Sequence, residues 1–312
     1  MTLQQTPMKR FLVFVLTFLI IGLAKSQSAE IGICAGTSFY MGDLNPKGVF
    51  KGARFAGGLL FRYNINPRFA FKATALFGSL YADDAKTGTA ERNLNFRSNL
   101  SELSAQMEIN FLKLYNEPGK NFISPYLFAG IALFSFNPQA ELNGKWYDLQ
   151  ALGTEGQELN KTDAEGNTYD KKRYSLTSVA IPFGIGLRVN FLKYYSVGIE
   201  WGFRYTFTDY LDDVGGYYPD RQLLIEYRSQ LIADLADRTT AQKKDKDGKP
   251  VTDAEGNPVI DFHKAGTARK TSDANDWYSF LTLNFTFKIT DVSKGCASPL
   301  RSKTTTKHLK RK

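Results

Sequence analysis

The sequence predicts an all-β fold, an eight-stranded antiparallel transmembrane β-barrel with long extracellular loops and periplasmic termini. Three observations predict it: eight segments that alternate apolar and polar residues, connections that alternate between short and long, and an export signal at the amino terminus. A period of two indicates a strand, because successive side chains point to opposite faces of a sheet. In a small membrane barrel the apolar face contacts lipid, while small or polar residues fill the interior.

The first 26 residues are predicted to be a secretory signal peptide. Lys9 and Arg10 precede an apolar run from Phe11 to Leu23, and Ala24-Lys25-Ser26 follows it, which is typical of such signals. The run is shorter than the about 20 residues that a membrane-spanning helix needs, and a retained anchor is the alternative. An exported chain without helical spans can cross lipid only as a closed barrel, so we expect it in the cell outer membrane.

The barrel is expected to occupy residues 27–290. The clearest strand is 197–208, where Val197, Ile199 and Trp201 share one face and Gly198 and Glu200 the other. The remaining segments are 30–42, 53–65, 68–81, 98–113, 122–136, 174–192 and 277–289. Short connections follow the second, fourth and sixth segments, and the longest loops span about 137–173 and 209–275. That alternation is typical of outer-membrane barrels, and a soluble sandwich or lipocalin-like barrel is the alternative.

The face opposite the aromatic residues carries charges of both signs, which we expect to form a structural network inside the lumen. The lumen of an eight-stranded barrel is just wide enough for side chains to fill it, and isolated buried charges are costly. Pairing between opposite charges would therefore plug the barrel, and a charged path for protons or solutes is the alternative. The predicted members are Arg54, Arg62, Lys72, Glu102, Glu108, Arg188, Glu200 and Arg204.

The long loops contain turn signals and one helical pattern. Residues 163–167 and 253–257 share the sequence Asp-Ala-Glu-Gly-Asn and are predicted to be hairpin tips. A calcium site is the alternative, but neither segment has the full ligand pattern of an EF-hand loop. Within 220–241, apolar residues recur at helical spacing, which predicts an amphipathic helix; they are Leu224, Tyr227, Leu231 and Leu235.

No catalytic, cofactor-binding or metal-binding residues are predicted. His263 and His308 have no evident partner in the sequence, and no nucleophile motif stands out. We therefore expect a non-enzymatic protein that contacts outer-membrane lipid and binds no nucleic acid.

Residues 291–312 form a basic tail that we expect in the periplasm. It contains seven Lys and Arg residues and one acidic residue, Asp291, which leaves an excess of six positive charges. This excess equals the net charge of +6 that the chain has without the signal peptide. The tail is either a solvated, disordered segment or an electrostatic tether to an acidic periplasmic protein. Cys296 lies in it and could pair with Cys34 or form a disulfide with a partner protein.

Several stretches of the sequence match the motifs of a known family. The most specific are 208–214 and 275–278, and the others are 40–44, 125–130, 136–138 and 181–186. In these stretches the chain resembles the PorG-like family of outer-membrane proteins in the type IX secretion system of Bacteroidetes. The resemblance covers nearly the whole mature chain, although the insert at 220–268 and the tail are less typical.

This resemblance implies a function. Members are expected to anchor a periplasmic lipoprotein ring of the protein secretion machine to the outer membrane, and in some hosts that machine also drives gliding motility. The contacts would be made through the periplasmic turns and the tail. The alternative is a stand-alone small barrel, either a narrow porin or an adhesin.

Overall fold

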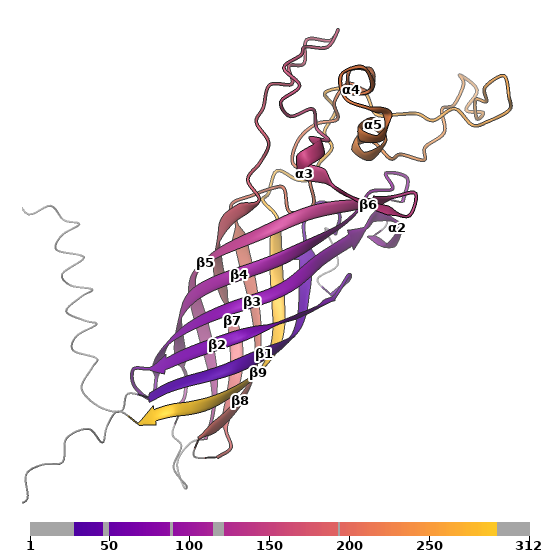
Figure 1. Ribbon diagram of the computed structural model, residues 1–312. Coiled ribbons are helices and arrows are strands. Elements are labelled where there is room, and N and C mark those ends of the chain that lie inside the picture. The colour runs from indigo at the N-terminus through magenta and orange to yellow at the C-terminus, as the bar shows by residue number, and fades with distance from the viewer. Residues whose placement is uncertain (1–27, 46–49, 88–89, 115–121, 193, 292–312) are drawn as a thin grey trace, which may run out of the picture.

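A closed barrel of eight antiparallel strands confirms the predicted fold class (Figure 1). The computed structural model describes residues 28–45, 50–87, 90–114, 122–192 and 194–291. Each strand pairs with the next around the barrel, and pairing between the first and last strands completes the ring. The strands are β1 (Ser28–Met41), β2 (Arg54–Asn64), β3 (Phe69–Asp83), β4 (Asn95–Asn110), β5 (Ile123–Leu142), β7 (Thr177–Asn190), β8 (Tyr195–Thr206) and β9 (Trp277–Asp291).

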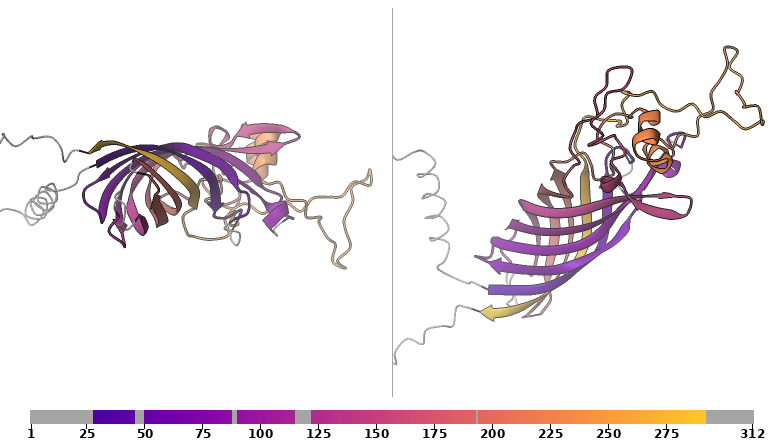
Figure 2. Two further views of the ribbon diagram at one scale, coloured as in Figure 1. Left: turned by 90° about the horizontal axis from the view of Figure 1, so that it is seen from below. Right: turned by 45° about the horizontal axis from the view of Figure 1, so that its top comes forward.

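The two ends of the barrel differ. β1 begins and β9 ends at one end, called here the turn end, where the connections β2–β3, β4–β5 and β7–β8 are short (Figure 1). The opposite end, the loop end, carries the long connections (Figure 2). Its short elements are α2 (Asp84–Thr87), β6 (Lys145–Asp148), α3 (Leu149–Leu152), α4 (Arg221–Tyr227) and α5 (Gln230–Ala236). Among the described residues, no helix is long and apolar enough to span a bilayer.

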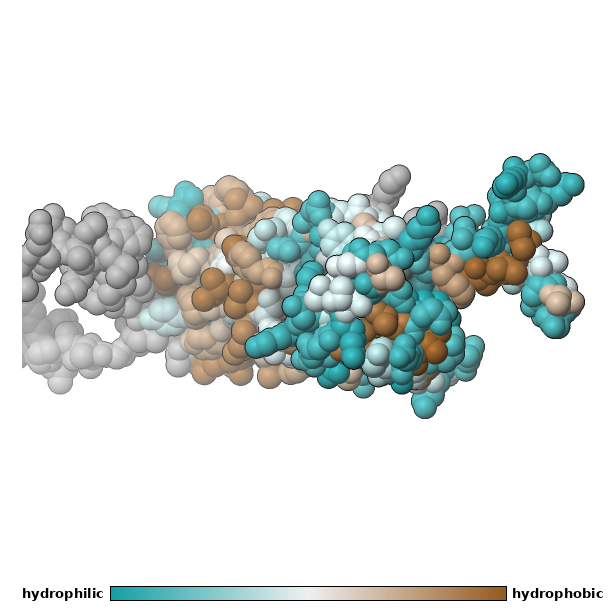
Figure 3. Space-filling model, turned by 90° about the horizontal axis from the view of Figure 1, so that it is seen from above, coloured by the Kyte–Doolittle hydropathy of each residue, from teal (hydrophilic) through white to brown (hydrophobic). Residues whose placement is uncertain are grey.

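The outer wall of the barrel is apolar. Phe55 and Ile131, for example, are 76% and 72% exposed. Figure 3 shows apolar residues over the barrel and hydrophilic residues over the loop end. Aromatic side chains pack against one another near both ends, with Trp201 beside Phe203 on one side and Tyr195 beside Phe287 on the other. A contiguous apolar surface of this size with aromatic residues near its borders is typical of a wall that faces lipid.

Two details differ from the sequence-based expectations. β5 runs on to Leu142 and pairs there with β6, within the predicted loop, because a strand beyond the lipid needs no apolar alternation. Instead of one helix there are two, because the chain turns at Arg228 and Ser229, whose hydroxyl accepts a hydrogen bond from the Ile232 amide and caps α5. In addition, Pro182, which has no backbone N–H to donate, interrupts the pairing of β7 with β5, while pairing with β8 continues.

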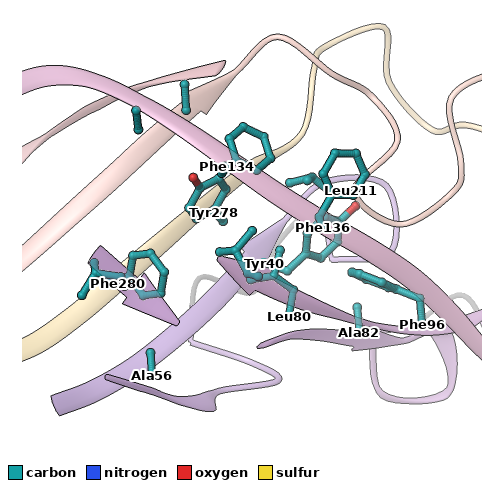
Figure 4. Close-up of a cluster of buried hydrophobic side chains, with 14 of the residues drawn as sticks. Tyr40, Ala56, Leu80, Ala82, Phe96, Phe134, Phe136, Leu211, Tyr278 and Phe280 are labelled. Carbon is teal, nitrogen blue, oxygen red and sulfur yellow. The ribbon is translucent and has the colours of Figure 1, made fainter. Parts of the chain in front are cut away.

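The interior has two layers. Charged and polar side chains fill the half near the turn end, and an apolar cluster fills the half near the loop end. Figure 4 shows part of that cluster, including Tyr40, Phe96, Phe134, Leu211 and Phe280. The predicted signal peptide, the tail beyond Asp291 and Cys296 lie outside the described residues. Cys34 is buried and faces the interior, with its Cα opposite those of Gly58 and Asn284.

Candidate functional site: the filled lumen and its acidic cap

The larger of two ion-pair groups in the lumen is built around Glu108 on β4. Arg62 on β2 donates from Nε and Nη2 to the two Glu108 oxygens at 2.8 and 3.1 Å, and from Nη1 to Glu30 at 3.2 Å. Lys72 on β3 lies 3.2 Å from Glu108 and also pairs with Glu200 across the lumen. All five side chains are buried. Because each charge has an opposite partner, the desolvation cost of burying them is largely offset.

The second ion-pair group lies further toward the loop end. Arg204 on β8 donates from Nε and Nη2 to Glu102 on β4 at 3.0 and 3.2 Å, a bidentate geometry. The Tyr278 hydroxyl donates to the same carboxylate at 2.9 Å, and the Arg204 guanidinium lies 4.7 Å from the centroid of the Phe280 ring. This pair therefore joins the ionic layer to the apolar layer above it.

The structure brings seven of the eight predicted network residues into these groups or beside them. Arg188 is the most loosely held, with Nη1 3.3 Å from Asn64 and 3.8 Å from Glu108. Glu30 belongs to the network but was not predicted, although alternation places it on the inward face of the first strand.

Arg54 requires a correction, because it lies outside the network. It is exposed where β2 begins, with its guanidinium 4.3 Å from the centroid of the Tyr81 ring. The alternation of apolar and polar residues assigned Arg54 to the correct face of the strand. The same alternation does not show how far along the barrel axis a residue lies.

Above the apolar layer, three segments that are far apart in the sequence meet in a buried acidic cap. The Tyr40 hydroxyl lies 2.5 Å from Oδ2 of Asp212 and 2.8 Å from Oδ1 of Asp276. The free oxygens of these carboxylates accept from the backbone amides of Val214 and Leu211, at 3.0 Å each. These contacts hold the segment 211–214 down onto the barrel.

Gly42 and Asp43 extend the cap toward the β1–β2 connection. A Cβ at position 42 would lie 1.8 Å from Oδ1 of Asp276, so only glycine fits there. Oδ1 of Asp43 accepts from the Thr271 amide and hydroxyl at 2.7 and 2.6 Å, and from the Ser272 amide at 3.1 Å. The stretches 40–44, 208–214 and 275–278, which carry much of the family resemblance, therefore form a single site.

A second group of buried charged residues holds the other side of the loop 208–216. Arg269 donates from Nη1 to the Asp213 carbonyl at 2.5 Å and lies 3.4 Å from the carboxylates of Asp213 and Glu155. Glu155 in turn accepts from the amides of Gly215 and Gly216 at 3.1 and 3.0 Å. The loop is thus fixed by charge-assisted hydrogen bonds, which are stronger than bonds between neutral groups.

The geometry of the cap requires a shared proton. One phenol hydrogen cannot serve two carboxylates, so both short contacts of Tyr40 form only when Asp212 or Asp276 carries a proton. Burial, together with nearby Asp43, raises the pKa of Asp212 well above its usual range. Burial and Asp212 do the same for the pKa of Asp276. At the edge of the cap, burial and Asp43 raise the pKa of Asp209 to about 7.

The predicted hairpin tips are turns with a repeated structure. Oδ1 of Asp163 and of Asp253 accepts from the amide four residues later, at 2.7 and 2.8 Å, and Gly166 and Gly256 adopt positive φ. Oxygens of Asp163, Glu165 and Asp220 lie within 4.8 Å of one another. Both oxygens of Asp163 already accept hydrogen bonds within its own hairpin, so we assign this acidic group to the turn.

His263 has a partner that the sequence did not reveal. Its Nδ1 lies 3.0 Å from Asp237, and its ring stacks on Tyr218 with 4.1 Å between the ring centroids. This arrangement joins the two ends of the 237–263 segment and holds them against Tyr218.

A closed barrel with an apolar outer wall, a filled lumen and a folded cap defines a small membrane β-barrel protein. The chain belongs to the family described as a domain of unknown function, DUF6089, whose model matches residues 9–151 and 160–231. No curated protein sequence matches it.

Solved barrels are similar to this chain at low sequence identity. Neisserial surface protein A has 10% identity and a TM-score of 0.38, covering 85% of this chain and 100% of that one. The attachment invasion locus protein of Yersinia pestis has 7% identity and a TM-score of 0.34, covering 85% and 98%. The outer membrane protein OprG of Pseudomonas aeruginosa has 9% identity and a TM-score of 0.32, covering 85% and 96%. The strand pairing of this chain by itself defines the closed barrel.

Proposed function

We propose that this protein is a non-enzymatic structural component of the type IX protein secretion system that anchors a periplasmic lipoprotein ring to the outer membrane. The apolar wall and the barrel fold support an outer-membrane location. In the proposed orientation the loop end faces the outside of the cell and the turn end faces the periplasm.

The observation that carries the proposal is the filled lumen. Ion pairs occupy one half of the interior and an apolar cluster occupies the other, with the loop 208–216 fixed above them. A barrel built in this way suits an anchor better than a pore, which disfavours the narrow-porin alternative. The cap adds support, because three of the stretches that resemble the PorG-like family, 40–44, 208–214 and 275–278, contact one another there.

The proposed contact surface is the turn end together with the basic tail. The β2–β3 turn is well ordered, since Oδ1 of Asn66 accepts from the amides of Arg68 and Phe69 at 2.8 and 2.9 Å. Arg68 is exposed beside it and donates to the Phe111 carbonyl of the next turn at 2.9 Å. The other predicted contact points, Pro118, Lys193 and Cys296, lie outside the described residues.

Co-purification from native membranes tests the proposal. The protein is captured under non-reducing conditions after mild crosslinking, as wild type, as a truncation after Asp291 and as Cys296→Ser. We expect periplasmic ring components to accompany the wild type. Loss of those components on truncation but not in Cys296→Ser would assign the contact to the rest of the tail, and loss in both variants would assign it to a disulfide through Cys296.

A matched control removes the exposed segment 243–259 at the loop end, which should leave co-purification unchanged. Ring components that persist in both tail variants would move the contact to the turns at Asn66, Pro118 and Lys193. A barrel that comes out of native membranes alone would contradict the secretion role.

One observation favours an adhesin as the second candidate. The long loops are folded onto the barrel through buried pairs such as Arg269 with Asp213, as expected for a surface that presents a fixed shape. Loss of cell-surface binding after removal of residues 220–268, with the barrel intact, would support this alternative.

A further inference from the structure

A pocket of about 230 Å³ opens between the loop segments 155–171 and 210–218 at the loop end. Its volume is smaller than the roughly 300–1,000 Å³ of pockets that bind drug-sized ligands. The pocket therefore has room for a ligand with a single ring. Its walls are mainly aromatic and polar. The residues used below are Gln157, Tyr169, Lys171, Tyr210, Tyr217 and Tyr218.

Three of the four tyrosines are fixed before any ligand arrives. Tyr169 donates to Asp163 at 2.7 Å and accepts from the Asp220 amide at 3.0 Å. Tyr210 stacks on Tyr174 with 4.4 Å between centroids. Tyr218 stacks on His263, as described above. Because the walls are already ordered, a ligand would bind without the entropic cost of ordering them.

The fourth tyrosine and two polar groups are available to a ligand. Tyr217 is 53% exposed at the rim and offers a ring face. Gln157 is only 4% exposed, and its Nε2 has no hydrogen-bond partner among the described residues. Lys171 is exposed and forms no ion pair within the described part of the chain. A buried donor left unpaired is destabilising, and a ligand oxygen that accepts from it would remove that cost.

We propose that this pocket binds a single sugar ring that carries a carboxylate. Tyrosine faces suit the apolar face of such a ring, and hydroxyl oxygens would accept from Gln157. The carboxylate would pair with Lys171, whereas Glu155 in the wall already serves Arg269 and two backbone amides. Such a sugar would come either from a polysaccharide of the same cell surface or from a glycan of another cell. The inference does not depend on the proposed periplasmic role.

The test measures binding of glucuronic acid and of glucose to the full mature barrel in detergent, by saturation-transfer NMR. We expect glucuronic acid to bind more tightly than glucose. Tyr217→Ala and Lys171→Gln should each weaken binding of the acidic sugar about tenfold. The control Tyr227→Ala removes a similarly exposed tyrosine from α4, outside the pocket, and should have no effect.

Closure of the barrel in every variant is verified by its heat-dependent migration on gels, so a loss of binding cannot come from an unfolded barrel. Polysaccharide released from the host's own outer leaflet then separates the two sources, because competition by it assigns the site to the same cell surface. Absence of binding by either sugar and by the polysaccharide would overturn the proposal. Equal binding by wild type, Tyr217→Ala and Lys171→Gln would overturn it as well.

Discussion

At the scale of single residues, depth along the barrel decides what a charged side chain does. Arg54 and Arg62 lie eight residues apart on the same face of β2, yet only Arg62 is buried among carboxylates. Sequence alternation predicted most of the network because it identifies the inward face. It failed at Arg54 because hydropathy does not mark where the packed lumen ends.

The bidentate Arg204–Glu102 pair should be essential for stability. Glu102→Gln leaves a buried guanidinium without its counter-charge and should lower the free energy of unfolding by about 3–5 kcal/mol. The matched control, Arg54→Gln, should cost no more than about 1 kcal/mol, because it removes only an exposed cation–π contact. Urea unfolding of the barrel in lipid vesicles measures both, and equal effects would contradict the assigned roles.

The acidic cap should loosen as the pH rises. Asp209, Asp212 and Asp276 have raised pKa values, so the closed cap binds more protons than the open loop. Their stabilising effect is therefore complete below the unfolded pKa of about 3.9 and is lost as the pH rises through each folded pKa. The neighbouring charges that act on the cap are Asp43, Glu155, Arg92 and Lys270.

Hydrogen exchange of the amides in 208–214, corrected for the intrinsic rate, measures this loosening. For Asp209 the window runs from about pH 4 to about pH 7, so Asp209→Asn should flatten the profile there. The control is Asp273→Asn, an exposed partner of the same Lys270 whose own pKa is lowered. Protection that stays constant with pH in the wild type would contradict the shared-proton cap.

At the scale of elements, the barrel strands could be predicted from the sequence and the cap could not. Strand positions follow from local alternation, which the lipid imposes on every residue it contacts. The contact between Tyr40 and Asp212 joins residues 172 positions apart, so no local pattern reveals it. β6 was missed for a related reason, since it lies beyond the lipid and is only four residues long.

The arm at 242–260 should be dispensable for folding. Its ends are already joined, because Asp261 donates to the Ala241 carbonyl at 2.8 Å and Gln242 pairs with Ile260. Replacing 243–259 by Asn-Gly closes that pair with a tight turn. The unfolding free energy should then change by no more than about 0.5 kcal/mol.

A matched variant inside the cap should behave differently. Leu211→Ala removes a fully buried side chain and should cost about 2–5 kcal/mol. Urea unfolding of both variants tests the distinction. A large loss from the arm deletion would show that the arm supports the barrel.

At the scale of the whole molecule, the chain combines a wall for lipid with an interior that leaves little room for solutes. Paired charges occupy the half near the turn end, and aromatic and aliphatic side chains occupy the other half. The loop above is fixed at Asp212, Asp213 and Asp276. A molecule of this form is suited to holding a position in a membrane and presenting its two ends.

Conductance across a planar lipid bilayer tests the central claim, that the barrel is a filled anchor and not a pore. The folded wild-type protein is inserted near neutral pH, with a known porin inserted under the same conditions as the positive control. The account predicts no steady conductance above that of the bare bilayer. A stable, ohmic conductance from the wild-type barrel would contradict it.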